Sequence, residues 1–393
     1  MGGVSMEWKE DVLGNVLEVK YGKDHKKLAD GQYPVYGSGG LMRYVDSKLY
    51  DGPSILIPRK GTLNNIMFVE SPFWTVDTMF WSIINTDKVD PKFLFYSICK
   101  RDFASMNVGS AVPSMTVNIL NDIQISYPKN IEDQRRIASI LSSLDRKIEL
   151  NNKINADLEE MAQAIFKNWF VDFEPFKDGK FVDSELGMIP EGWKVGKITD
   201  IGCLITDYVS NGSFASLKQN VHLYETKEYA QFIRNTDLKT NTFSVYVDKH
   251  SYDFLSKSTL YGNEIIISNV GDVGSVHLCP KLDIPMTLGN NIIMLRPNEK
   301  EYNYFLYLWF KYFSGQGLIQ GIKGGSAQPK FNKTDFKNLP LLIPSFEIIE
   351  RSYWIFESMF SILSSNVKEN SRLSTLRDTL LPRLMSGELE VPE

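Results

Sequence analysis

Two long stretches of the chain place apolar residues at alternating intervals of four and three. The first stripe contains Ile137, Leu141, Leu144, Ile148, Leu158, Ala162, Ile165 and Trp169, with Asn151 and Asn155 in its middle. A 3.5-residue repeat of this length predicts a coiled-coil helix. Asparagine in such a seam lowers stability but fixes register, so the pair favours a specified partner helix. An ordinary buried helix interrupted by polar residues is the alternative.

The second stripe is broader and lies near the end of the chain. Its members are Phe356, Phe360, Leu363, Val367, Asn370, Ser374, Leu381 and Leu384, and Arg377 interrupts it. Asn370 is placed to face the asparagines of the first stripe. We expect Pro382 to break this helix near its end, because proline removes a backbone donor and clashes with the preceding turn.

The first predicted helix constrains the architecture through its length. A helix of about 40 residues spans roughly 60 Å and carries the chain away from the globular unit before it. If the second helix pairs with the first, it must run antiparallel and return towards the first unit. The prediction is a dumbbell with a pseudo-two-fold axis and both termini near the first unit.

An internal repeat connects the two globular parts. Residues 109–113 read Gly-Ser-Ala-Val-Pro and residues 325–329 read Gly-Ser-Ala-Gln-Pro, an offset of 216. Upstream, residues 52–61 match 262–271 at an offset of 210, and Trp8 matches Trp193 at an offset of 185. The second copy therefore holds about 31 extra residues, all placed before its Gly-Ser-Ala-x-Pro loop. Repetition on this scale predicts two related modules.

Each module reads as an α/β unit with a bent, mostly β core and one helix, so we expect the α/β fold class. The predicted organisation is a globular domain at 1–130, a long helix and linker at 131–185, a second globular domain at 186–344 and a long helix at 345–393. The predicted elements are strands at Ser54–Pro58, Phe80–Ile84, Glu264–Ser268 and Asn291–Leu295, and helices at Lys92–Lys100 and Tyr302–Phe313.

A loop after the first apolar strand of each module carries candidate nucleic-acid contacts. In module one, residues 58–65 read Pro-Arg-Lys-Gly-Thr-Leu-Asn-Asn, which supplies phosphate contacts and base-edge donors from one segment. The candidates there are Arg59, Lys60, Thr62, Asn64 and Asn65, together with Arg43. The matching loop of module two offers Asn269 and Asp272 and is not basic. Variable surface loops without a ligand are the alternative interpretation.

The repeated Gly-Ser-Ala-x-Pro segment is the second candidate. Its small residues suit close approach to a sugar-phosphate backbone, and a purely structural turn explains them equally well. The candidates are Ser110 and Ser114 in module one and Lys323, Ser326, Gln328, Lys330 and Lys333 in module two.

Charge and composition narrow the class of protein. The apolar content of 43% and charged content of 23% are those of a globular protein, and no apolar run approaches the roughly 18 residues of a membrane span. The formal charge is −5, but the four segments carry 0, −4, +2 and −3 in order, so the excess acid lies in the helices. The globular modules are thus free to present a basic face.

Cysteine usage points to a reducing cytoplasm. Three cysteines are far apart and odd in number, which argues against a disulfide framework. His277 lies two residues from Cys279 but has no second pair of ligands, so we expect no metal site. The chain also has no Asn/Asp-Pro-Pro-Tyr/Phe element for amino-methyl transfer and no Gly-x-x-x-x-Gly-Lys-Ser/Thr loop for ATP, so we expect no catalysis.

These motifs together resemble the specificity (S) subunits of type I restriction–modification systems over essentially the whole length. Besides the Gly-Ser-Ala-x-Pro loops and the Pro128 and Pro344 strand ends, the resemblance rests on residues 132–137, 163–176, 184–193 and 381–388. The second helix departs from the family pattern at its start, where residues 347–353 read Glu-Ile-Ile-Glu-Arg-Ser-Tyr. That departure weakens only the local inference about partner contact.

The resemblance implies two target recognition domains, each of which reads one half of a split sequence in double-stranded DNA, with the helices as a ruler. It implies two modification (methyltransferase) subunits and restriction subunits as partners, which carry S-adenosylmethionine, ATP and Mg. The helix seam that would pair and dock partners contains Ile137, Leu141, Leu144, Ile148, Asn151, Asn155, Leu158, Ile165, Phe360, Leu363, Val367 and Asn370. The competing hypothesis is a scaffold with two peptide-binding units on a coiled coil.

Overall fold

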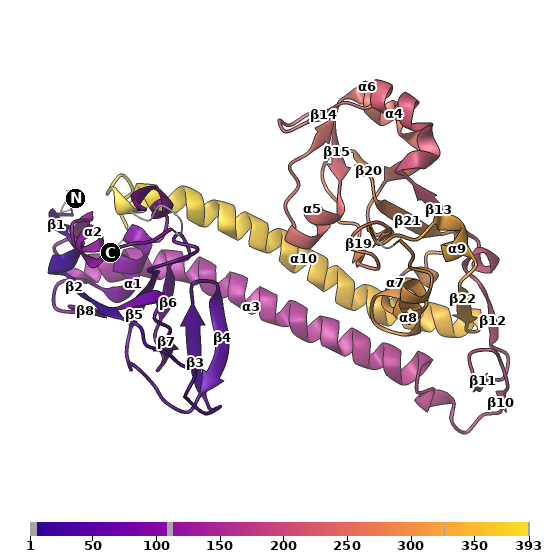
Figure 1. The fold of residues 1–393 in the computed structure, drawn as a ribbon, viewed down its shortest axis with the longest axis horizontal. Helices are drawn as coiled ribbons and strands as arrows, with labels where there is room; N and C mark the ends of the chain where they lie inside the picture. Colours follow the sequence, from indigo (N-terminus) through magenta and orange to yellow (C-terminus); the bar gives the residue numbers. More distant parts are fainter. Residues whose placement is uncertain (1–5, 108–112, 326, 392–393) are drawn as a thin grey trace. The chain divides into compact units, whose positions relative to one another are not determined.

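A computed structural model describes residues 6–107, 113–325 and 327–391. The chain forms two compact units (Figure 1). Unit 1 combines residues 1–151 with 368–393, and unit 2 comprises residues 152–367. Each unit therefore contains a globular part and half of each long helix, so the predicted return of the chain to its first unit is confirmed.

Unit 1 is built from three small sheets. Its strands are β1 (Trp8–Val12), β2 (Leu17–Tyr21), β3 (Tyr33–Gly37), β4 (Gly40–Val45), β5 (Ser54–Pro58), β6 (Met67–Val69), β7 (Trp74–Thr75), β8 (Met79–Ile84) and β9 (Gln124–Pro128). They form a four-stranded sheet of order β2-β8-β5-β6, a three-stranded sheet β4-β3-β7 and the pair β1-β9. Strand β5 is buried along its whole length, as its apolar run predicts.

Two short helices complete the globular part of unit 1. Helix α1 (Pro91–Ile98) begins at Asp90, whose carboxylate accepts a hydrogen bond from the Phe93 backbone N–H. Helix α2 (Val117–Asn121) begins at Thr116 in the same way. The structure confirms the predicted helix near Lys92–Lys100, shifted by one or two residues at each end.

Unit 2 repeats this plan and extends it. Strands β13 (Cys203–Asp207), β18 (Ile265–Ser268), β19 (Val276–Leu278) and β21 (Ile292–Pro297) form a sheet of order β13-β21-β18-β19, which matches β2-β8-β5-β6. The pair β12 (Lys194–Lys197) and β22 (Pro340–Ile343) matches β1-β9. The registers agree as well, because Leu56 faces Met67 in unit 1 and Ile266 faces His277 in unit 2.

The extra residues of unit 2 enlarge the remaining sheet and add helices. Five strands replace three, in the order β14-β16-β15-β20-β17: β14 (Leu223–Tyr224), β15 (Ala230–Ile233), β16 (Tyr246–Val247), β17 (Thr259–Leu260) and β20 (Met286–Leu288). The added helices are α4 (Phe214–Asn220), α5 (Asn235–Thr240), α6 (Lys249–Phe254) and α8 (Ser314–Gly321), whereas α7 (Tyr302–Tyr312) and α9 (Lys333–Lys337) correspond to α1 and α2. A short strand pair, β10 (Phe181–Val182) with β11 (Ile189–Pro190), precedes β12.

The expectation of a single helix per globular unit is therefore wrong for both units, because the described residues of unit 1 form α1 and α2 and those of unit 2 form α4 to α9. Most of the unexpected helices are short: α2 and its counterpart α9 have five residues each, and α4, α5 and α6 have six or seven, too few to produce a recognisable 3.6-residue pattern. Local side-chain caps start them instead: Ser213 accepts from the Ser216 N–H, Asp248 from Ser251 and Asn332 from Asp335.

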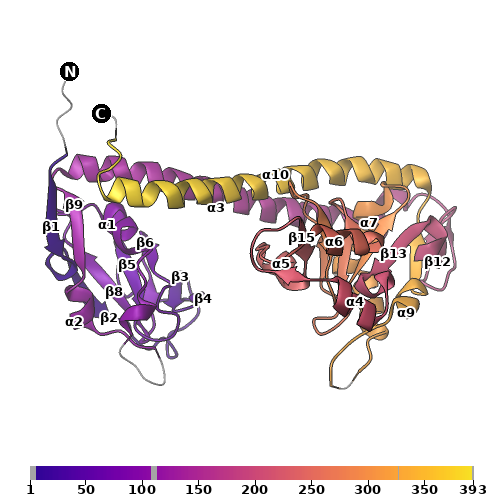
Figure 2. The ribbon, with the colours of Figure 1, turned by 90° about the horizontal axis from the view of Figure 1, so that it is seen from above.

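The two long helices are α3 (Ile131–Phe170) and α10 (Phe346–Met385), each of 40 residues. They run antiparallel within each unit. In unit 1, Asp145 meets Arg377 and Asn151 meets Asn370. In unit 2, Asn155 meets Asn366 and Phe166 meets Phe356. Figure 2 shows the strands of unit 1 on one side of that unit's helix segments.

The predicted break at Pro382 is wrong, because α10 continues through it to Met385. Leu381 and Leu384, on either side of the proline, are both buried in the unit 1 core. Their packing outweighs the cost of one missing backbone hydrogen bond so close to the helix end. The Pro382 carbonyl still accepts a bond from the Ser386 N–H at 3.0 Å.

Candidate nucleic-acid interface

The two candidate loops of unit 1 lie side by side although some fifty residues separate them. The Gly61 N–H donates to the Pro113 carbonyl at 3.2 Å, and the Met115 N–H donates to the Arg59 carbonyl at 2.9 Å. Lys60 and Ser114 face each other in an isolated β-bridge between these bonds. The loop after β5 and the loop before α2 therefore form one continuous surface.

Unit 2 repeats this pairing bond for bond. The Gly271 N–H donates to the Pro329 carbonyl at 2.8 Å, the Phe331 N–H donates to the Asn269 carbonyl at 3.0 Å, and Val270 faces Lys330. Each residue corresponds to its unit 1 counterpart at the repeat offsets of 210 and 216. We call this arrangement the loop pair of each unit. It holds the backbone in the same way in both units while the side chains differ.

A glycine sits at the same crossing in each loop pair. The φ angles of Gly61 and Gly271 are 87° and 78°, a region that side chains with a Cβ rarely adopt. Glycine at these positions lets each loop turn sharply at the point where its N–H reaches the facing proline carbonyl.

In unit 1 the loop pair presents cationic and small polar side chains. Lys60, Thr62 and Ser114 lie at the surface, and among the described residues Lys60 forms no ion pair. The Arg59 guanidinium lies over the ring of Tyr21, 5.6 Å from its centroid. Tyr21 is 55% exposed, so an aromatic face stands beside the basic loop. Sequence reasoning missed Tyr21, although an exposed aromatic residue at a strand end is a signal for base or sugar contact.

Three other candidates in unit 1 shape the loops instead of presenting free polar groups. The Asn65 amide donates to the Ser38 carbonyl at 2.8 Å, which ties the loop to the β3–β4 turn. Asn64 accepts from the Ala104 N–H at 2.9 Å and donates to Asp102 at 3.2 Å. Arg43 donates to the Leu28 carbonyl at 2.7 Å and lies 3.3 Å from Asp30. The structure thus gives these residues supporting contacts.

In unit 2 two candidates are engaged in a similar way. Asp272 forms an ion pair with Lys239 at 2.6 Å and accepts from Asn235 at 3.1 Å, and the Lys239 contact is the main reason that its pKa is lowered. Both partners belong to α5, a helix that the sequence reading did not predict. Lys333 donates to Ser210 at 2.6 Å and pairs with Asp207 at 3.0 Å.

Three of the remaining candidates of unit 2 are more accessible, and Asn269 is not. Lys323, Gln328 and Lys330 are exposed, and within the described part of the chain neither lysine forms an ion pair. The buried Asn269 side-chain oxygen has no hydrogen-bond partner among the described residues. Ser110 and Ser326 lie outside the residues that the structure describes.

The seam asparagines pair across the long helices. In unit 1 the Asn151 amide donates to Asn370 at 2.9 Å and to Glu369 at 2.7 Å. In unit 2 the Asn366 amide donates to Asn155 at 2.9 Å. Burial of the other predicted seam positions is graded: Ile137, Leu141 and Phe360 are buried, and Leu144, Ile148, Leu158, Ile165, Leu363 and Val367 are partly buried.

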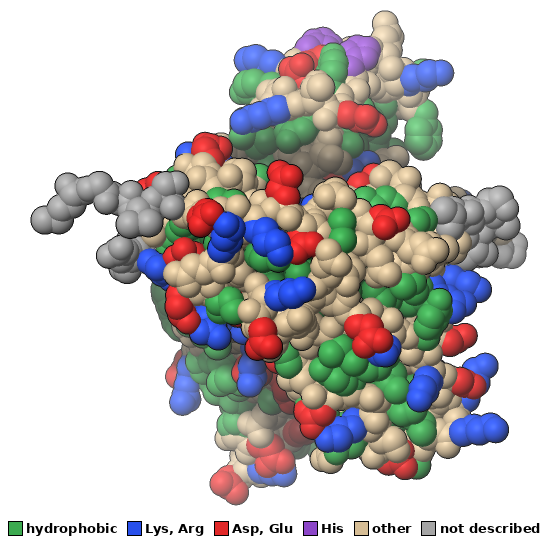
Figure 3. Space-filling view, turned by 90° about the vertical axis from the view of Figure 1, so that its left-hand side faces the viewer, with side chains coloured by type: hydrophobic (Ala, Val, Ile, Leu, Met, Phe, Trp, Pro, Cys, Tyr) green, Lys and Arg blue, Asp and Glu red, His purple; other side chains and the backbone are tan. Residues whose placement is uncertain are grey.

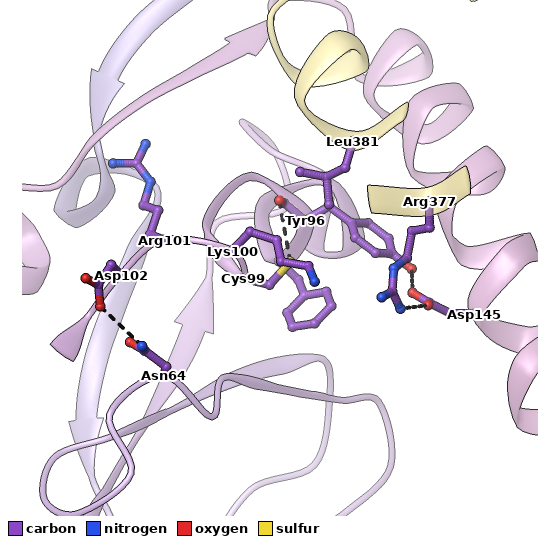
Figure 4. A pocket seen from close by; sticks show the side chains of 10 residues that line it. Asn64, Tyr96, Cys99, Lys100, Arg101, Asp102, Asp145, Arg377 and Leu381 are labelled. Carbon is purple, nitrogen blue, oxygen red and sulfur yellow. Dashed lines mark hydrogen bonds and ion pairs between the residues drawn. The ribbon is translucent and has the colours of Figure 1, made fainter. Parts of the chain in front are cut away.

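A pocket of about 410 Å³ marks the joint between α1 and the long helices of unit 1 (Figure 4). The Tyr96 hydroxyl donates to Asp145 at 2.6 Å, and Arg377 donates to the same carboxylate at 2.6 Å. Arg377, which interrupts the apolar stripe, thus has its partner on the facing helix. Burial raises the pKa of the neighbouring Cys99 thiol to about 11, so it is not a nucleophile at neutral pH. The polar groups here fasten helices together.

Unit 2 fastens its helices with the same chemistry. Tyr304 on α7 donates to Glu357 on α10 at 2.7 Å. Glu159 on α3 accepts from Lys311 at 2.6 Å and from Tyr312 at 2.8 Å. Burial alone would raise the pKa of Glu159, but these two donors outweigh it and lower the pKa. The apolar part of the joint is aromatic, because Phe166 packs against Phe170, Phe305, Phe313 and Phe356.

Charge on the displayed face of the molecule is mixed. Figure 3 shows basic and acidic side chains interspersed there, with apolar side chains between them. Among the described residues no helix is long and apolar enough to cross a membrane. Within the same residues no three His, Cys, Asp or Glu side chains are grouped so that they could hold a metal ion.

Comparisons with known proteins agree with this architecture. The family described as type I restriction modification DNA specificity domain matches residues 6–160 and 190–374. The MjaIX specificity subunit of a type I restriction enzyme from Methanocaldococcus jannaschii is 28% identical over 395 residues, covering 94% of this chain and 86% of that protein. The HindI specificity subunit from Haemophilus influenzae is 26% identical, covering 82% of this chain and 83% of that protein.

A solved structure shows the same fold. The crystal structure of the S subunit of a type I restriction–modification system from M. genitalium superposes with a TM-score of 0.66 at 17% identity, covering 100% of this chain and 98% of that one. The two matched sequence blocks each contain one loop pair and part of α3 or α10. The chain therefore belongs to the type I restriction–modification DNA specificity family, as a specificity subunit.

Proposed function

We propose that each globular part binds one half of a bipartite target in double-stranded DNA. The observation that carries the proposal is the loop pair, which repeats three backbone contacts in both units and presents different side chains on them. A fixed backbone frame with variable side chains suits two readers that approach DNA alike and recognise different bases.

The long helices act in this proposal as the spacer that sets the gap between the half-sites and as the site that docks two modification subunits. Helices of 40 residues measure about 60 Å, and successive major grooves are roughly 34 Å apart. The spacer role is supported by the antiparallel pairing of the long helices in each unit, where asparagines fix the register.

Methyl transfer and cleavage belong in this proposal to partner subunits, which bring S-adenosylmethionine, ATP and Mg. At the unit 1 pocket, Asp145, Arg377 and Lys100 bond to groups on neighbouring helices or at their ends, so they serve the joint. The chain's own contribution is therefore to choose the sequence and to hold the partners at it.

Methylome sequencing of the source cell, with and without the gene, tests the proposal. We expect adenine methylation at a bipartite motif that disappears when the gene is deleted. If deletion of the gene removes no methylated motif, or if the purified complex methylates DNA without sequence preference, the proposal is refuted. Binding that is insensitive to salt would favour a peptide-binding scaffold, because DNA binding releases counterions and weakens steeply with salt.

Domain exchange gives a sharper test of modularity. Replacing residues 1–130 by the corresponding part of another specificity subunit should change one half of the methylated motif and leave the other half intact. A change in both halves would contradict independent reading by the two units.

A further inference from the structure

A second basic segment of unit 1 lies outside the loops discussed so far. Strand β2 is followed by residues 22–27, which read Gly-Lys-Asp-His-Lys-Lys. Lys23, Lys26 and Lys27 are all exposed, and within the described residues none of them forms an ion pair. The one carboxylate of the segment, Asp24, accepts a hydrogen bond from the Lys26 backbone N–H at 3.0 Å. The segment therefore carries excess positive charge at the surface.

Backbone hydrogen bonds place this segment beside the unit 1 loop pair. The Gly22 N–H donates to the Met79 carbonyl at 3.0 Å and the Lys23 N–H to the Thr75 carbonyl at 2.9 Å. The N–H groups of Arg59 and Lys60 donate to the Thr78 carbonyl at 2.8 and 3.2 Å. Both basic segments thus bond to the same connection between β7 and β8.

Two further observations place the segment after β2 close to the loop after β5. The approach at Gly22 is tight, because a Cβ there would lie 2.0 Å from the Val76 carbonyl oxygen. The Arg59 guanidinium covers Tyr21, the residue immediately before this glycine. We call Tyr21, Lys23, Lys26, Lys27, Arg59 and Lys60 the basic ridge.

Unit 2 lacks such a ridge at the corresponding place. The residues after β13, 208–214, read Tyr-Val-Ser-Asn-Gly-Ser-Phe and contain no charged side chain. Lys333 reaches this region, but Asp207 neutralises it and Ser210 binds its ammonium group. Phe214, at the end of the segment, is 81% exposed. Near its loop pair and the segment after β13, unit 2 offers three exposed lysines without an ion pair among the described residues: Lys323, Lys330 and Lys257, whose backbone N–H donates to Asn211 at 3.0 Å.

We propose that the basic ridge is a phosphate-binding surface through which unit 1 supplies most of the sequence-independent affinity for DNA. The inference rests on the proposed function and adds a division of labour to it. Five cations beside one loop pair neutralise more phosphates than three near the other, and each neutralised phosphate contributes about 0.9 to the slope of log affinity against log salt. Phosphate contacts position a protein and carry no base information, so the ridge anchors unit 1 whatever it reads.

The test measures binding of the full chain, in complex with its modification subunits, to a duplex that carries the methylated site and to a scrambled duplex, from 50 to 200 mM salt. The variant is K23Q/K26Q/K27Q. The matched control is K180Q/K194Q/K281Q, which removes the same charge from exposed lysines of unit 2 that lie outside the long helices and form no ion pair in the described structure. Thermal unfolding verifies that both variants are folded.

We expect the ridge variant to reduce the magnitude of the slope of log affinity against log salt by about 2 to 3. The variant should therefore bind DNA much more weakly than wild type at 50 mM salt, and this difference in affinity should shrink on the order of 40-fold by 200 mM. The methylated motif should be unchanged, and the control should match wild type. An unchanged slope in the ridge variant, or an equal loss in the control, would overturn the proposal. So would loss of a modification subunit from the complex without a change in slope, since the ridge would then bind an acidic protein surface. If wild type does not prefer the site over the scrambled duplex, the proposed function itself fails.

Discussion

The two units share a backbone frame and differ in almost everything attached to it. Both have the same four-stranded sheet order and the same three contacts in the loop pair. Unit 1 adds a basic ridge and joins its long helices through aliphatic residues such as Leu141 and Leu384. Unit 2 adds short helices and an aromatic joint around Phe166. Backbone hydrogen bonds can therefore keep the frame of a module constant while the side chains around it diverge.

The aromatic joint should be the most sensitive point of unit 2. Phe166 is fully buried, so Phe166→Ala removes its packing and leaves a cavity, and it should destabilise unit 2 by about 3–5 kcal/mol. Leu141→Ala is the matched change on the same helix in unit 1, with an expected cost of about 2–4 kcal/mol. Hydrogen exchange resolved by segment measures both. Equal loss of protection in both units from either change would show that the units do not unfold separately.

The asparagine pairs should differ in strength. Asn151 is fully buried and donates two hydrogen bonds, so Asn151→Ala leaves Glu369 and Asn370 without their amide partner and should cost about 1–3 kcal/mol. Asn155→Ala removes a partly exposed partner of Asn366 and should cost less than about 1 kcal/mol. Denaturant unfolding of both variants measures the difference, and an equal cost would contradict the distinction.

The two units differ at one equivalent strand position, where only unit 2 has a titratable residue. His277 in unit 2 stands where unit 1 has Met67. Burial, followed by the charges of Lys311 and Lys239, lowers the pKa of His277 to about 4. Between pH 6.5 and 4 the unfolded chain binds a proton that the folded chain does not, so stability falls as the pH falls.

Substitution isolates that effect. His277→Gln keeps a polar partner for Ser275 and removes the titration, so it should abolish about 1–2 kcal/mol of acid destabilisation of unit 2 over this range, allowing for partial exposure. Unfolding measured at pH 7 and pH 4.5 checks it. A pH dependence identical to wild type would place the acid sensitivity elsewhere.

Substitution of the loop-pair glycines should give the smallest difference in stability cost between the two units. Alanine at either position pays the strain of a positive φ, roughly 1–2 kcal/mol. A Cβ at Gly61 would lie 3.0 Å from the Ser38 hydroxyl, whereas a Cβ at Gly271 would meet nothing within 4 Å. Gly61→Ala should therefore cost about 0.5–1 kcal/mol more than Gly271→Ala in thermal unfolding. The reverse order would mean that the β3–β4 turn moves away freely.

The sequence predicts the main strands and the long helices because these elements follow regular apolar patterns. The strand Ser54–Pro58 and the long helices follow from apolar periodicity, and the repeat offsets predict the matching sheets. The Gly-Ser-Ala-x-Pro repeat indicated related loops but not their bonding to the loops after β5 and β18, because that contact links residues far apart in the chain.

The misses share a physical cause. Short capped helices such as α4 depend on single side-chain bonds, and Arg377 appeared misplaced because its partner Asp145 lies on another helix. The sequence analysis predicts Asn64, Asn65 and Lys333 as nucleic-acid contacts, whereas in the fold their polar groups bond to neighbouring segments of the chain. Residue type in a loop indicates what chemistry is available, and the tertiary contacts decide what remains unused.

The asparagine pairs also restrict how the helices can change length during evolution. Each amide finds its partner only when the two helices stay in register, so an insertion into one helix alone would leave buried polar groups unmatched. Paired insertions of whole heptads keep the apolar seam facing inward, and each adds about 10.5 Å to both helices. If the helices space the half-sites as proposed, the spacer changes in steps of roughly three base pairs, because the DNA helix rises about 3.4 Å per pair.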